Sequence, residues 1–368
     1  MKLRIAQLLS LTASAALFAA CSGNGTDPQP TGPYTNGVFV RNEGSFFDNN
    51  GTLSWLSRSG TPGRAETDVF QVRNKRPLTG GVQDYVEVGN RGIILVDHSS
   101  AGLDKIEIVT ADSLRSVKTI TGLENPRAVV GVSDTKAYVT CYGATGSNPY
   151  FANNGYVAVL DLVSNTVTKQ IPLGKGPEGI TVVGSEAFVG SADYSGTKAI
   201  TVIDTRTDAV KQAVPVATEV NELVADANNK LWGISGKSIV RIDPISKTVE
   251  ATIPVGPASG ANSPGNLTPS ADRRSFYYRY SGYDVAYNIV GQIYRFSITD
   301  ATIAPTTPVI NRQFVGFTGL GFDAKANVLY AGITPSYKQA GYVLRYQPTG
   351  QVIDSIRVEI APSGFYFK

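Results

Sequence analysis

The chain has 368 residues, of which 42% are hydrophobic and 17% charged, and its formal net charge is +3. This composition excludes a disordered protein, and the near-neutral charge disfavours binding to nucleic acid. The many Gly, Tyr, Val, Ile and Thr residues favour strands and tight turns, and no apolar run at helical spacing follows the N-terminal segment.

The N-terminus has the pattern of a secretory signal. Lys2 and Arg4 precede the apolar run 5-IAQLLSLTASAALFAA-20, which is too short for a membrane-spanning helix. The run ends in FAAC, which resembles the lipobox of bacterial lipoproteins, and this resemblance implies a lipid on Cys21. Ser22 follows it, which in such lipoproteins implies sorting to the outer membrane. The alternative is an ordinary cleaved signal with an incidental cysteine.

The segment after Cys21, 22-SGNGTDPQPTGPYTNG-37, is rich in Gly, Pro, Asn and Ser, and such a composition predicts a flexible tether. If Cys21 carries a lipid, Cys141 is the one remaining thiol, so an intramolecular disulfide is impossible. Cys141 lies in an apolar strand pattern and is expected to be an inert core residue.

One pattern of four strands recurs along the chain. The stretch 126-PRAVVGVSDTKAYVTCYG-143 returns as 177-PEGITVVGSEAFVGSAD-193, and each is followed by a loop and two further strands. A repeat of about 40 to 50 residues indicates stacked supersecondary units. First strands of such units are predicted at 82-VQDYVEV, 127-RAVVGV, 178-EGITVV, 222-ELVADA, 266-NLTPSA and 319-GLGFDA, with 362-PSGFYFK-368 as a seventh.

These units predict an all-β fold, a seven-bladed β-propeller of four-stranded antiparallel blades. The C-terminal GFYFK matches an innermost strand, while 37-GVFVRNEG-44 and 52-TLSWLSR-58 match the second and third strands of the same blade. Pairing these pieces closes the ring and leaves no exposed inner edge. We therefore expect a signal peptide at 1–20, a tether at 21–36 and a single, monomeric propeller at 37–368.

Strand alternation assigns each loop to a face of the propeller. The turns from first to second and from third to fourth strand lie on one face and are short; the loops from second to third strand lie on the other and are long and aromatic. Aromatic and amide side chains are typical of recognition surfaces, although these rings could instead merely cover the blades. The candidate ligand-binding residues among them are Phe46, Phe47, Asn49, His98, Tyr142, Tyr150, Phe151, Tyr194, Tyr283, Tyr287 and Tyr337.

A second group of residues opens the innermost strands on that same face, where they are expected to ring the mouth of the central channel. In this group Arg127, flanked by Glu178 and Asp84, could orient a polar ligand. The alternative is a salt-bridge network that closes the channel, because buried charges must be paired. The group comprises Gln83, Asp84, Arg127, Glu178, Asn221, Glu222 and Asn266.

The residues of common catalytic and metal sites are scarce. His98 is the only histidine, which rules out histidine-cluster metal sites and leaves few general-base arrangements. The chain has no CxxC motif and no Gly-rich phosphate loop between a strand and a helix. The DNNG at residues 48–51 lacks the ligand spacing of a calcium loop and predicts a plain turn. We expect no enzymatic activity, no metal and no cofactor.

Several of these stretches resemble a known family. AYVTC at residues 137–141, followed by VAVLDL and VTKQIPLGKGPEGI, resembles the YVTN-repeat (YncE-like) β-propellers. The N-terminal VFVRNEGSFFDNNGTLSWLS and the C-terminal IAPSGFYF are similar to a branch of outer-membrane propeller lipoproteins that includes the BtuG cobalamin-binding proteins. Cys141 departs from the motif, which has Asn there, so no role of that amide is carried over.

The resemblance implies a lipid-anchored protein of the outer membrane, at the cell surface, that captures a scarce nutrient and passes it to a TonB-dependent transporter. A corrinoid is the best guess for the nutrient, since the aromatic, amide-rich loops suit a large, partly apolar ligand decorated with amides. A glycan or a protein would suit them too. The main alternative is a cell-envelope scaffold without a small-molecule ligand; a propeller enzyme and a single-strand nucleic-acid binder are further alternatives.

Overall fold

The computed structural model describes residues 32–60, 63–285, 287 and 289–368. The expected signal peptide, Cys21 and most of the expected tether lie outside the described residues. In the described ranges, no helix is both long and apolar enough to cross a membrane.

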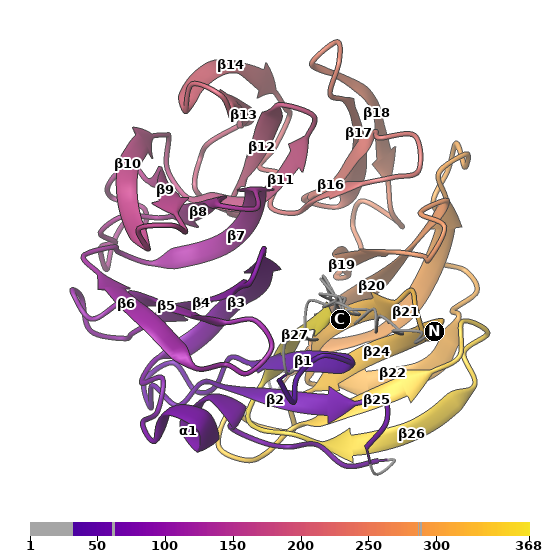
Figure 1. The fold of residues 1–368 in the computed structure, drawn as a ribbon. Coiled ribbons are helices and arrows are strands. Elements are labelled where there is room, and N and C mark those ends of the chain that lie inside the picture. The colour runs from indigo at the N-terminus through magenta and orange to yellow at the C-terminus, as the bar shows by residue number, and fades with distance from the viewer. Residues whose placement is uncertain (1–31, 61–62, 286, 288) are drawn as a thin grey trace, which may run out of the picture. The chain divides into compact units, whose positions relative to one another are not determined.

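The described chain folds into seven antiparallel sheets arranged around a centre (Figure 1). Blade 1 contains β3 (Gly81–Val88), β4 (Arg91–Asp97), β5 (Lys105–Thr110) and β6 (Ser116–Thr121), and blade 2 contains β7 (Pro126–Ser133), β8 (Lys136–Cys141), β9 (Tyr156–Asp161) and β10 (Thr166–Pro172). Blade 3 contains β11 (Pro177–Val183), β12 (Glu186–Ser191), β13 (Ala199–Asp204) and β14 (Ala209–Pro215).

The next three blades follow the same plan. Blade 4 contains β15 (Leu223–Ala225), β16 (Leu231–Ser235), β17 (Ser238–Asp243) and β18 (Thr248–Pro254). Blade 5 contains β19 (Ser263–Pro269), β20 (Ser275–Tyr283), β21 (Ile289–Ser297) and β22 (Ile310–Val315), and blade 6 contains β23 (Phe317–Asp323), β24 (Val328–Ile333), β25 (Tyr342–Tyr346) and β26 (Val352–Arg357). In all six, the strands are ordered as in the chain, and the first strand of each contacts the first strand of the next, so the first strands are innermost.

The apolar pattern of the strands follows their place in the blade. In β4 the four consecutive residues Ile93–Val96 are all buried, because a central strand of a blade is covered on both faces by neighbouring blades. The outermost strand β6 is exposed along almost its whole length and carries Lys118. A charged, exposed edge of this kind resists pairing with other chains.

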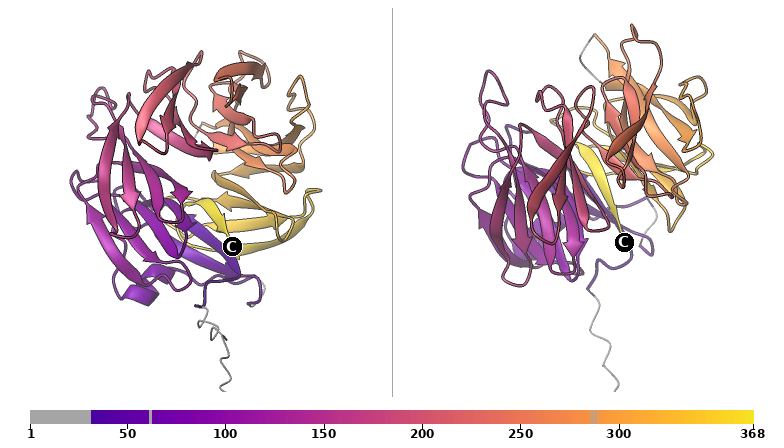
Figure 2. Two further views of the ribbon diagram at one scale, coloured as in Figure 1. Left: turned by 45° about the horizontal axis from the view of Figure 1, so that its top comes forward. Right: turned by 90° about the horizontal axis from the view of Figure 1, so that it is seen from above.

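The closing blade joins the two ends of the described chain, as predicted. Its strands are β27 (Pro362–Phe367), β1 (Gly37–Asn42) and β2 (Thr52–Ser57), in that order from the inside, and Val40 pairs with Phe365. β27 also contacts β23 and β3, which completes the ring, and both views of Figure 2 place the yellow end of the chain beside the indigo beginning. The all-β seven-bladed propeller is thereby confirmed.

The outer edge of the closing blade differs from the other six. A fourth strand is reduced to an isolated bridge between Trp55 and Glu66, and helix α1 (Val69–Asn74) follows it. The helix buries Val69 and Phe70 against the blade. Its three apolar residues, Val69, Phe70 and Val72, span a single helical turn, which is too short a run to reveal a helix by its periodicity.

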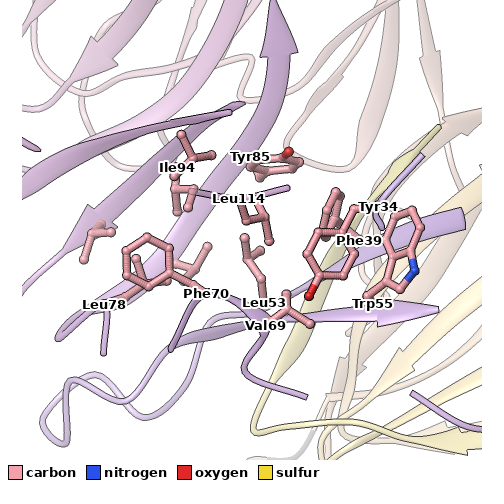
Figure 3. Close-up of a cluster of buried hydrophobic side chains, with 13 residues drawn as sticks. Tyr34, Phe39, Leu53, Trp55, Val69, Phe70, Leu78, Tyr85, Ile94 and Leu114 are labelled. Carbon is pink, nitrogen blue, oxygen red and sulfur yellow. The ribbon is translucent and has the colours of Figure 1, made fainter. Parts of the chain in front are cut away.

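The core between the closing blade and blade 1 begins before β1. Tyr34 is fully buried and lies edge-on to the rings of Phe39 and Trp55, with centroids 5.6 and 5.4 Å away (Figure 3). Tyr366 of β27 packs edge-on against Tyr85 in the same cluster. The packed structure therefore includes the last residues of the segment expected to be a tether.

Candidate ligand-binding site

The antiparallel order of the strands places the loops as the repeat predicts. In blade 2 the turn from β7 to β8 has two residues, 134–135, whereas the loop from β8 to β9 runs over residues 142–155 on the opposite face. We call the face with the second-to-third-strand loops the loop face. The segments 45–50, 98–104, 144–154, 194–198, 281–285 and 334–340 belong to it.

A cavity of about 1070 Å³ opens at the mouth of the central channel. This volume is just above the range usual for small-molecule sites, about 300 to 1,000 Å³. All seven inner-strand residues expected at the mouth line it: Gln83, Asp84, Arg127, Glu178, Asn221, Glu222 and Asn266. Of the aromatic candidates, the cavity is lined by Tyr142, Tyr150, Phe151 and Tyr194.

Three of these rings form an aromatic wall on blade 2, which we define as Tyr142, Tyr150 and Phe151. Each ring meets the other two edge-on, with Phe151 centred 5.0 Å from both tyrosines. The guanidinium of Arg127 lies 4.9 Å above the ring of Tyr142, at the distance of a cation–π contact. Tyr194 is 95% exposed at the rim of the cavity, on the loop after β12. The wall therefore presents ring edges and faces beside the charged side chain of Arg127.

Arg127 links two carboxylates at the base of the wall. Its Nη1 lies 3.3 Å from Asp97 Oδ2, and its Nε lies 3.7 Å from Glu178 Oε1. The Tyr142 hydroxyl donates a hydrogen bond to Glu178. Asp84, which was expected to flank Arg127, instead pairs with Arg41 at 2.8 Å. Arg41 reaches Asp84 because it comes from the second strand of the closing blade, where the opposite residue on β27 is Gly364 and leaves room for the guanidinium.

Two of the mouth carboxylates connect neighbouring blades. Asp84 Oδ2 accepts a hydrogen bond from the backbone N–H of Val129 at 3.0 Å. Glu222 accepts from the backbone N–H groups of Asn266 and Leu267, at 3.2 and 2.7 Å. These bonds satisfy buried backbone donors, so Asp84 and Glu222 hold blades together as well as lining the cavity.

Burial shifts the pKa values of the acidic side chains in this region. It raises the pKa of Glu178, which Arg127 opposes, and it raises the pKa of Glu222, which the two backbone donors oppose. Burial raises the pKa of Asp97 to about 7, against the attraction of Arg127 and with a further rise from the nearby carboxylate of Asp104. Burial therefore favours the protonated form of these three acids, while nearby arginine or backbone N–H groups favour the charged form.

Other candidates lie around the cavity without lining it. Phe46, Phe47 and Tyr337 line an adjacent cavity of about 300 Å³, which shares Glu43 and Gln83 with the main one. Tyr283 lines another, also about 300 Å³, between β20 and β21.

The remaining three candidates reach none of these cavities. Tyr287 is exposed on the loop after β20. Asn49 ties two loops together, since its side-chain oxygen accepts from the Ser99 backbone N–H at 2.8 Å. His98 Nδ1 accepts from the Ser100 backbone N–H at 2.9 Å. Asn49 and His98 thus have local structural partners.

The cavity also contains charged residues that the sequence analysis did not select. Arg41 and Glu43 enter from β1 and the loop after it, Lys175 from the link between blades 2 and 3, and Asp193 from the loop after β12. Arg41 lies opposite Gly364 of β27, a signal that becomes readable only once the register between β1 and β27 is known. Cys141 is buried, and burial raises the pKa of its thiol, as fits a core residue. Within the described ranges, no three His, Cys, Asp or Glu side chains could together hold a metal ion.

Comparisons with solved structures show the same fold at low identity. A quinonprotein alcohol dehydrogenase-like protein of Bacteroides thetaiotaomicron is 16% identical with a TM-score of 0.64, and the match covers 89% of this chain and 78% of that one. A hydrazine synthase of Kuenenia stuttgartiensis is 15% identical with a TM-score of 0.56, and the match covers 84% and 92%. A functionally unknown protein of Desulfotomaculum acetoxidans is 12% identical with a TM-score of 0.58, covering 90% and 99%.

One curated relative matches part of the chain. The seven-bladed β-propeller protein Rv1057 of Mycobacterium tuberculosis is 28% identical over 147 residues, which are 39% of this chain and about a third, 35%, of that protein. A family model described as a domain of unknown function, DUF5074, matches residues 36–368, the whole propeller. The chain is therefore a member of the DUF5074 family and a seven-bladed β-propeller distantly similar to Rv1057.

Proposed function

We propose that this propeller is an outer-membrane lipoprotein, anchored through Cys21 at the cell surface, that binds a scarce nutrient and passes it to a TonB-dependent transporter. A corrinoid is the proposed nutrient. The proposal joins the lipobox-like FAAC and the resemblance to the YncE-like branch that includes the BtuG proteins with the site at the channel mouth. It assigns the protein a binding role and no catalytic one.

The observation that carries the proposal is the combination of an aromatic wall and a polar floor in one cavity of about 1070 Å³. Tyr142, Tyr150 and Phe151 offer apolar ring surface, while Gln83, Asn221 and Asn266 offer amides at the floor. A corrinoid has a large, partly apolar ring with amide-bearing side chains, and both of its surfaces would find partners here.

Transfer to a transporter requires a docking surface near the ligand. The loop face exposes large apolar side chains around the cavities: Phe47 is 84% exposed, Tyr283 71%, Val285 101% and Tyr287 85%. Exposed apolar groups gathered on one face mark interaction sites. The same observation supports the second candidate, a cell-envelope scaffold that binds proteins alone.

The first experiment titrates cyanocobalamin and cobinamide into the processed protein, purified from membranes in detergent, and follows heat and absorbance. We expect saturable binding of both at submicromolar concentration. Phe151→Ala should weaken binding about tenfold, because one aromatic packing surface is removed. Neither corrinoid changing heat or absorbance would refute the corrinoid proposal.

Ile245→Ala is the matched control for the aromatic variant. Ile245 is 88% exposed in the turn from β17 to β18, on the face opposite the loop face. This variant should bind like the wild type. Co-purification of a transporter only in the presence of corrinoid would favour the nutrient role, whereas partners captured by a protein that binds no corrinoid would favour the scaffold.

A further inference from the structure

Acidic side chains outnumber basic ones along the mouth of the channel. The cavity is lined by the carboxylates of Glu43, Asp84, Glu178, Asp193 and Glu222, and by three basic side chains, Arg41, Arg127 and Lys175. Both arginines are already engaged, since Arg41 pairs with Asp84 and Arg127 with Glu178 and Asp97. Little positive charge is left to receive an anion.

Three of the five carboxylates lie where blade 3 meets blade 4. Together with Asn221 they form a group that we call the acceptor cluster: Glu178, Asp193, Asn221 and Glu222. The Asn221 side-chain nitrogen donates to Asp193 Oδ2 at 3.3 Å, and its backbone oxygen accepts from the N–H of Gly179 at 3.0 Å. These contacts place the four residues together at the rim and floor of one cavity. Lys175 is the basic lining residue on the same side.

Some acceptors in this region receive no hydrogen bond from the described residues. The side-chain oxygens of Asn221 and of the neighbouring Asn266 are buried, and neither accepts a hydrogen bond from those residues. Both asparagines line the cavity, so rotation of either amide would bring its oxygen to an N–H group of a ligand, and this pairing would remove the cost of a buried acceptor without a donor. The carboxylates also repel one another: Asp193 contributes to the raised pKa of both Glu178 and Glu222.

We propose that the acceptor cluster selects ligands that present N–H donors, either a protonated amine or primary amides, and rejects carboxylates and phosphates. This inference rests on the proposed ligand-binding role of the same cavity and adds the charge class of the ligand. The aromatic wall packs the apolar ring of the ligand while the cluster binds its donors. A protonated amine would lower the repulsion among Glu178, Asp193 and Glu222, whereas an anion would add to it.

The test uses two probes with the same ring and opposite charge, benzylammonium and benzoate. Ligand-observed NMR with the detergent-purified protein should show saturation transfer to benzylammonium and little to benzoate at pH 7. Asp193→Asn keeps the shape of the side chain and removes its charge, so it should weaken benzylammonium binding about threefold or more. Because Asp193 is an exposed loop residue, the variant should fold normally, which its melting temperature checks.

Asp134→Asn is the matched control, since Asp134 is exposed in the turn from β7 to β8 on the opposite face. It should bind both probes like the wild type. Equal binding of the two probes, stronger binding of benzoate, binding of neither, or an unchanged affinity in Asp193→Asn would each overturn the inference. If cobinamide fails to bind while benzylammonium binds as expected, the corrinoid assignment falls and the charge selectivity stands.

Discussion

Asp97 lies at the end of β4, 3% exposed, between Arg127 and Asp104. Asp104 is itself buried and accepts backbone hydrogen bonds from His98 and Asn125, at 2.6 and 2.8 Å, so it stays close to Asp97. Two neighbouring carboxylates out of water do not readily ionise together. Burial raises the pKa of Asp97 to about 7, against the attraction of Arg127 and with a further rise from Asp104.

This titration makes stability depend on pH. An unfolded aspartate has a pKa of about 3.9, so between pH 4 and pH 7 the folded protein keeps a proton that the unfolded chain has lost. The free energy of unfolding therefore falls as the pH rises through this range. Since one pKa unit corresponds to about 1.4 kcal/mol, the loss is on the order of 4 kcal/mol by pH 8.

We expect Asp97→Asn to remove much of this dependence, because asparagine cannot ionise and Arg127 keeps Glu178 as a partner. Urea unfolding of wild type and variant at pH 5, 6, 7 and 8 measures the difference, which should grow in favour of the variant as the pH rises. Asp134→Asn, on the opposite face, should follow the wild type. Parallel stability curves for Asp97→Asn and wild type would contradict the assignment.

At the scale of the element, the second strand of a blade sets how closely the next blade approaches. A side chain on Gly190 in β12 would overlap the backbone oxygen of Val220, and one on Gly332 in β24 would overlap that of Pro362. In β8 this position holds Thr140, whose hydroxyl donates to the backbone oxygen of Glu178 at 2.7 Å. The repeated AYVTC and AFVGS thus place a small or hydrogen-bonding residue where two blades meet.

Gly332→Ala should therefore destabilise the protein. The new methyl group would collide with the Pro362 carbonyl, a backbone group fixed within β27, and overpacking of this kind costs about 3 kcal/mol. Urea unfolding at constant pH measures the loss. Gly174→Ala is the control, because its nearest neighbour would be the side-chain oxygen of Thr197 at 3.2 Å and no backbone atom lies in its way. Equal stability of both variants would show that the blades adjust freely.

For the whole molecule, closure depends on β27, which contacts β23 on one side and β3 on the other. Phe365 and Phe367 pack with Tyr330 of blade 6, at 5.5 and 5.3 Å, whereas Tyr366 packs with Tyr85 of blade 1. Alternate side chains of one strand therefore bind two different blades, as the period of a strand requires.

Removal of residues 362–368 should abolish the cooperative fold, because the closing blade would lose its innermost strand and two blades would lose their neighbour. We expect loss of the near-ultraviolet circular dichroism of the buried aromatic residues and of a sharp thermal transition. Tyr366→Ala, which removes one ring and keeps the strand, should retain both with a lower melting temperature. A truncated chain that melts like the wild type would contradict this account of closure.

The architecture could be predicted because one repeat contains enough information: the order of strands in a unit determines which is innermost and on which face each loop lies. For the same reason the innermost-strand residues at the mouth could be placed from sequence. Arg41 and Glu43 could not, because they reach the cavity only after β1 has paired with β27. The partner of Asp84 was missed for that reason too.

The loops were less predictable than the strands. Their face follows from strand direction, yet their side chains divide among three cavities, and Tyr287 enters none of them. Long loops have no repeat to constrain them, so their paths depend on contacts such as those of Asn49 with Ser99.

Because β27 follows every other strand of the described chain, the ribosome makes the innermost strand of the closing blade only after the strands of the six other blades. Until those residues emerge, β1 has an open edge and the nascent polypeptide lacks the piece that joins blade 6 to blade 1. A chain cut short by proteolysis or premature termination is left in that same open form. The order of the strands therefore delays closure of the ring until β27 has emerged from the ribosome.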